Sequence, residues 1–132
     1  MRDGGNGGKT RLQLAVHEAG HVIACEAVGA PWRKAHIDEN GGMVDCDLTG
    51  LGRFERAVVF LCGQRAEARF AGAASAVAVG DDDAGCGLWH AADWKRLEAE
   101  VRYILDRGQV RLYALAEALA ETGSVAPTSL EG

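Results

Sequence analysis

The sequence has no cluster of lysine and arginine and no long uninterrupted hydrophobic run, and both absences limit what the protein can bind. Its formal net charge is −5, because Asp and Glu outnumber Lys and Arg by 19 to 14. Nucleic acids and anionic membranes attract basic surfaces, so this balance argues against both as partners. The most apolar stretch, 12–30, is interrupted by His17, Glu18, His21 and Glu26 and does not read as a membrane span.

A signal peptide and a C-x-x-C motif are also missing. The first residues, MRDGG, contain no apolar core, which predicts a cytoplasmic chain. The four cysteines are Cys25, Cys46, Cys62 and Cys86, and their spacing favours buried or free thiols over disulfides. The 132 residues suffice for one domain with its own core.

The HEAGH segment at 17–21 is the most informative feature that is present. On a helix, His17 and His21 lie one turn apart on one face, with Cβ atoms about 5–6 Å apart. That spacing lets both imidazoles reach one Zn²⁺ at about 2.0–2.1 Å, and Glu18 lies where it can deprotonate a zinc-bound water. The alternative is a surface helix on which two histidines happen to align.

The surroundings of the motif favour the catalytic helix. Thr10 and Gln13 are spaced as a capping box at a helix start, and apolar residues then recur with helical spacing. Gly29 and Pro31 predict the helix end. Cys25, one turn beyond His21, is expected to pack in the core, because a third bond from the same straight helix to the same ion is geometrically hard.

The remaining sequence predicts a mainly α, zincin-like helical domain with one small β-hairpin next to the HEAGH helix. Short strands at 35–38 and 43–46 flank a turn at 39–42 that contains Asn40-Gly41. Further helices are expected at about 52–70, 92–107 and 109–121. We expect residues 1–9 to form a flexible glycine-rich arm, 10–123 the zinc metallopeptidase-like domain, and 124–132 a frayed tail.

A catalytic zinc ion needs a third protein ligand and an open fourth position. The metzincin pattern would require Gly at 24 and His at 27, and both positions are alanine. Glu39, Glu55 and Glu67 are poorly placed for the thermolysin-like arrangement. An aspartate further along the chain is the remaining route.

Three segments in order, 17–21 (HEAGH), 61–67 (LCGQRAE) and 92–94 (ADW), resemble the peptidase domain of FtsH-type AAA+ zinc proteases. The resemblance covers about residues 10–107, and HEAGH is its most specific part. It implies that Asp93 is the third zinc ligand and that Glu67 supports the site. The ATPase module and membrane anchor of that family are absent from this sequence.

Asp93 also suits a ligand on physical grounds, because the helix dipole favours a carboxylate in a first turn and Zn²⁺ accepts Asp oxygen. An ordinary helix N-cap is the alternative role for Asp93. His90, three residues earlier, competes as the third ligand and could instead contact the substrate or a first ligand. The run Asp81–Asp83 is interpreted as a solvated loop.

The sequence thus predicts a zinc-dependent, ATP-independent peptidase that cleaves peptides or unfolded proteins, with Glu18 as general base. A small-molecule metallohydrolase or biosynthetic metalloenzyme, and a catalytically silent zinc-binding interaction module, stay open as alternatives. We expect a monomer or homodimer that could work with a separate ATPase.

Overall fold

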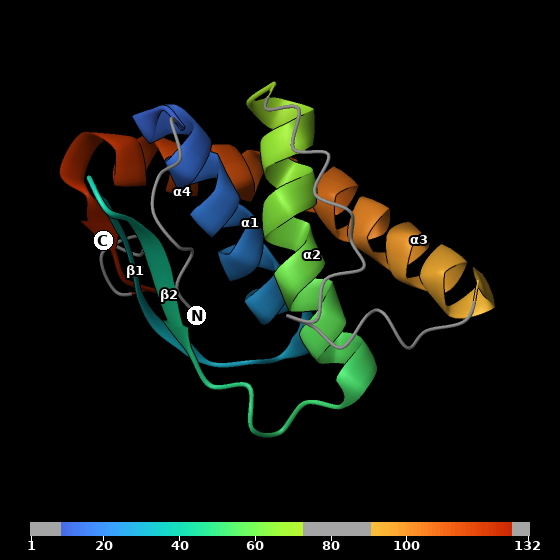
Figure 1. The fold of residues 1–132 in the computed structure, drawn as a ribbon. Helices are drawn as coiled ribbons and strands as arrows, with labels where there is room; N and C mark the ends of the chain where they lie inside the picture. Colours follow the sequence, from blue (N-terminus) through green and yellow to red (C-terminus); the bar gives the residue numbers. More distant parts are fainter. Residues whose placement is uncertain (1–8, 73–90, 128–132) are drawn as a thin grey trace.

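The computed structural model describes residues 9–72 and 91–127, and within them the chain is mainly helical with a small antiparallel sheet (Figure 1). The elements in chain order are α1 (Arg11–Val28), β1 (Trp32–Asp38), β2 (Gly41–Cys46), α2 (Arg53–Phe70), α3 (Ala91–Arg107), α4 (Gln109–Thr122) and β3 (Ser124–Val125). Helix α1 is central, because it contacts the other three helices and both long strands. No helix in these two ranges is both long and apolar enough to cross a bilayer.

Both ends of α1 follow from its sequence as predicted. The Thr10 hydroxyl accepts a hydrogen bond from the Gln13 backbone N–H at 3.1 Å, and the Gln13 side chain accepts one from the Thr10 N–H at 2.9 Å. This capping box satisfies donors that a helix start otherwise leaves open. At the other end Gly29 has a φ of 78°, a left-handed conformation that glycine adopts without strain.

The hairpin after α1 is longer than the sequence predicted. Strands β1 and β2 pair antiparallel from Asp38↔Gly41 back to Trp32↔Cys46, so only Glu39 and Asn40 form the turn. The Asp38 side chain accepts a hydrogen bond from the Asn40 N–H at 2.7 Å, which stabilises this tight reversal. The Asn-Gly signal located the turn correctly, but Gly41 and Gly42 belong to the strand.

The frayed tail predicted for 124–132 is wrong for Ser124 and Val125. Gly123 ends α4 with a φ of 85° and reverses the chain, and its carbonyl accepts a hydrogen bond from the Ile37 N–H at 2.9 Å. Ser124 and Val125 then pair with β1, so the sheet has three strands in the order β2-β1-β3. Burial of the Val125 side chain stabilises this pairing, which periodicity alone did not reveal. Residues 128–132 lie outside the described part.

The predicted helices at 52–70, 92–107 and 109–121 are confirmed to within a residue or two. Their apolar faces meet α1 in one core that includes Val58, Leu61, Leu97, Val101, Leu112, Leu115 and Leu119. Trp94 of α3 is half-buried and packs against this core. In Figure 1, α1 lies between the hairpin and α2, so its residues can contact both.

Gly20, inside the HEAGH motif, lies where α1 and α2 pack closely against each other. A Cβ atom at this position would lie 2.7 Å from both the Ala66 Cβ and the Cys62 carbonyl oxygen, and 3.0 Å from the Gly63 Cα. Ordinary side chains at a helix crossing keep the axes about 8–10 Å apart. The absence of a side chain at Gly20 therefore lets the two backbones touch.

We predict that Gly20→Ala destabilises the protein by about 1–3 kcal/mol, because the new methyl group meets backbone atoms that cannot rotate away. The same change in an unconstrained helix would stabilise it by about 1 kcal/mol. Gly50→Ala is the matched control, since a Cβ there has no atom within 4 Å. Urea unfolding of the three proteins measures the effect, and equal midpoints for Gly20→Ala and wild type would contradict the close crossing.

Candidate metal centre

Four ionisable side chains are buried around the HEAGH motif, three on α1 and one on α2. His17, Glu18, His21 and Glu67 are 5%, 0%, 1% and 1% exposed, respectively. The two imidazole rings lie edge to face with their centroids 4.7 Å apart. Burying four such groups costs free energy unless they are bonded or coordinate an ion. Their burial together is therefore the first indication of a functional site.

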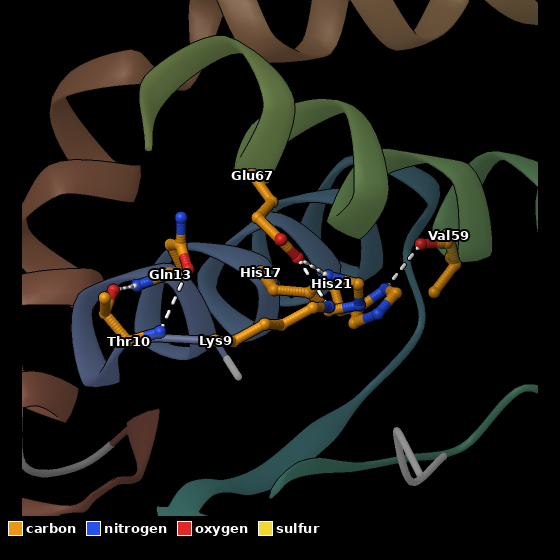
Figure 2. A network of polar contacts seen from close by, with 7 residues as sticks. All are labelled: Lys9, Thr10, Gln13, His17, His21, Val59 and Glu67. Atoms are coloured by element: carbon orange, nitrogen blue, oxygen red, sulfur yellow. Dashed lines mark hydrogen bonds and ion pairs between the residues drawn. The ribbon is translucent and has the colours of Figure 1, made fainter. Parts of the chain in front are cut away.

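Helix α2 contacts each of the two histidines at its Nδ1 atom. His17 Nδ1 lies 2.7 Å from the Glu67 carboxylate, and His21 Nδ1 lies 2.8 Å from the Val59 carbonyl oxygen (Figure 2). Because a carbonyl oxygen can only accept, His21 must donate from Nδ1. The Glu67 carboxylate assigns the same tautomer to His17. In this tautomer of a neutral imidazole, Nε2 is the nitrogen that can coordinate a metal ion.

The contacts on α2 repeat with helical spacing. Val59, Gly63 and Glu67 are four residues apart and form one stripe, which faces the i, i+4 stripe of His17 and His21 on α1. A Cβ at Gly63 would overlap the ring of His21, so only glycine leaves room for the imidazole. Glu67 of the α2 stripe thus contacts His17, while Val59 and Gly63 contact His21.

The hairpin approaches the remaining member of the cluster. A Cβ at Gly42 of β2 would lie 2.6 Å from both Cγ and Oε2 of Glu18. Glycine at this point of the strand therefore makes room for the carboxylate. Glu18 is thus enclosed between α1 and β2, beside the histidines that flank it in sequence.

Glu67 accepts two hydrogen bonds at one oxygen. Its Oε1 lies 2.7 Å from His17 Nδ1 and 2.8 Å from the Lys9 ammonium (Figure 2). Burial acts to raise the pKa of Glu67, but the hydrogen bonds from His17 and Lys9 outweigh it and hold that pKa below its usual value. Lys9, at the end of the predicted flexible arm, thus forms an ion pair with Glu67 of α2. Residues 1–8 lie outside the described part.

The third ligand stays a prediction. Asp93 lies in the first turn of α3 and is half-buried, and the described residues contain no group of three or more His, Cys, Asp and Glu side chains placed to hold a metal ion. The structure thus joins His17 to Glu67, places the His17 and His21 rings against each other and encloses Glu18 against Gly42. His90 and the Asp81–Asp83 run lie outside the described residues.

The donor set nevertheless suits zinc as far as it is described. Two imidazoles one helical turn apart, each with its Nδ1 atom against an oxygen acceptor, are the usual partial ligand set of a catalytic zinc site. A carboxylate directly beside them is the usual base. A scan against protein-family models and a search of curated proteins found no match to this chain. The assignment therefore rests on the chemistry of these residues.

Cys25 packs in the core, as expected. It is fully buried near the end of α1 and shares a hydrogen bond with Cys46 on β2. This hydrogen bond and burial both raise the pKa of the Cys25 thiol. The same hydrogen bond lowers the pKa of the half-buried Cys46 to about 7, against the opposing effect of burial.

We predict that Cys46 is the most reactive of the three described thiols and that its alkylation by iodoacetamide rises with pH around a midpoint near 7. Burial raises the pKa of Cys62, so that thiol should stay unmodified in the folded protein. Peptide-resolved mass spectrometry across a pH series measures the midpoint. Cys25→Ala is the control and should return it toward the ordinary thiol value of about 8.5. A wild-type midpoint already at that value would contradict the prediction.

Proposed function

We propose that this protein is a zinc-dependent hydrolase, most specifically an ATP-independent peptidase of the zincin type that acts on peptides or unfolded proteins. One observation carries the proposal: α2 contacts the Nδ1 atoms of both His17 and His21, so that Nε2 is the ring nitrogen through which each imidazole would coordinate an ion, and Glu18 is buried next to His17 in the sequence. The order of the three segments that resemble FtsH-type peptidases supports the same chemistry.

The residues of the proposed site would have separate roles in metal binding and proton transfer. His17 and His21 would hold the ion, with Asp93 as the proposed third ligand and His90 as the alternative. A bound zinc ion would supply Lewis acidity, which polarises a scissile carbonyl and makes a coordinated water acidic near neutral pH. Glu18 would accept the proton of the attacking water and return it to the leaving amine. Enclosure of Glu18 between α1 and β2 would keep bulk water from that proton.

Strand β2 offers a place for the substrate backbone. It is an edge of the described sheet, since β1 is its one strand partner in residues 9–72 and 91–127. An extended peptide can add to such an edge by backbone hydrogen bonds. Because Gly42 lies on β2 directly against Glu18, a peptide paired there would pass close to the general base. This favours a peptide over a small molecule as the substrate.

The metal part of the proposal predicts one zinc ion per chain. His17→Ala and His21→Ala should each abolish binding, because two ligands that remain cannot retain the ion at micromolar concentrations. Asp93→Ala should weaken it strongly, with His90→Ala as its matched comparison. Elemental analysis after dialysis gives the stoichiometry. If Asp93→Ala binds zinc fully and His90→Ala loses it, the third zinc ligand is His90 instead of Asp93. If the wild-type protein binds no zinc, the proposal is wrong.

The catalytic part predicts that Glu18→Gln keeps zinc and fold but loses hydrolysis. Glutamine has the size and hydrogen-bonding capacity of glutamate but cannot accept the proton, so the rate should fall by about 10²–10⁴-fold. Casein is the appropriate substrate because it needs no unfolding. If wild type and Glu18→Gln both hold zinc and are equally inert on casein and on a diverse peptide library, the protein is not a peptidase.

A further inference from the structure

The geometry points to Lys9 as a positioning residue of the metal centre, which fixes the orientation of His17 through Glu67. This inference rests on the proposed zinc site but concerns a residue outside the HEAGH motif. Lys9 would neither bind the ion nor touch the substrate. Its effect would pass through one carboxylate oxygen to one ring nitrogen.

The contact itself is close and shared. Figure 2 shows the Lys9 side chain running along α1 to the Glu67 oxygen that also faces His17. The ammonium lies 2.8 Å and His17 Nδ1 2.7 Å from this Oε1 atom. Two donors at one oxygen define its position far better than one, because each restricts the rotation that the other leaves free.

Charge explains why the second donor is needed. Glu67 is 1% exposed, whereas the Lys9 side chain is 32% exposed and reaches solvent. A buried carboxylate is costly unless it is paired. His17 brings a positive charge to this pair only when its imidazole is protonated. Among the described ion pairs of Glu67, only that with Lys9 brings a permanent positive charge.

The backbone of Lys9 is held next to the capped start of α1. Lys9 directly precedes Thr10, whose capping box with Gln13 defines the first turn of α1. The Thr10 carbonyl in addition accepts a hydrogen bond from the Leu14 N–H at 3.0 Å. Because the same helix carries His17, the cap sets the Lys9 backbone and the His17 ring in one rigid frame. The ammonium can therefore act as a fixed support for Glu67.

Three variants separate this role from general effects. Lys9→Met keeps the length of the side chain but removes its charge, Lys9→Arg keeps the charge, and Lys34→Met removes an exposed lysine on β1. The first measurement uses metal-free protein and long-range ¹H–¹⁵N spectra of the His17 ring at constant pH. We expect wild type, Lys9→Arg and Lys34→Met to show the Nδ1–H tautomer. Lys9→Met should show a larger fraction of the Nε2–H form.

The second measurement is zinc affinity, by competition with a chromophoric chelator. Changes to residues that orient a metal-bound histidine cost about 10–100-fold in affinity, and we expect that loss for Lys9→Met. Lys9→Arg should recover most of it, and Lys34→Met should match wild type. Unfolding midpoints measured alongside exclude a collapse of the fold as the cause.

The outcomes are distinct from those of the proposed function. An unchanged His17 spectrum and unchanged zinc affinity in Lys9→Met would overturn the role of Lys9, as would an equal loss in Lys9→Arg or Lys34→Met. If the spectra and affinities behave as expected while wild type leaves casein intact, Lys9 keeps its role and only the peptidase activity is lost. If wild type binds no zinc, the proposed function fails and the spectra of the metal-free protein still decide on Lys9.

Discussion

The contact of α1 and α2 at Gly20 is the constraint on which the rest of the site depends. Two helices whose backbones touch at one point have their neighbouring turns close as well. His17 and His21 flank Gly20 by three residues and one residue, so this contact carries both rings onto α2. The stripe of Val59, Gly63 and Glu67 can hold the rings only at this short separation.

Burying these ionisable side chains lowers the stability of the fold, and this cost indicates that they have a function. Four ionisable side chains occupy volume that Leu or Val would fill at lower cost, since a replaced ion pair in a core is often neutral or stabilising. The protein still encloses them in an apolar core with a carbonyl, a carboxylate and an ammonium as specific partners. Such arrangements are typical of sites where geometry matters more than stability.

The sequence predicted the local parts of this arrangement and missed the contacts between distant segments. Periodicity and caps located α1, α2, α3 and α4, because these signals lie within each helix. Glu67 was suggested only by the family resemblance. Lys9, Gly42 and the strand at 124–125 were missed, because each depends on a partner far along the chain. Gly63 had a signal, since glycine inside a helix costs about 1 kcal/mol and usually marks close packing.

Glu18 and the two histidines contact different elements of the fold. Helix α2 orients His17 and His21, whereas β2 encloses Glu18 through Gly42. Helix α1 presents all three from one rigid backbone, so their order around a shared centre is set by its pitch alone. A displacement of the hairpin would therefore change the surroundings of Glu18 and leave both ring contacts intact. If the proposed peptide pairs with the edge of β2, its binding would act on the same hairpin that encloses Glu18.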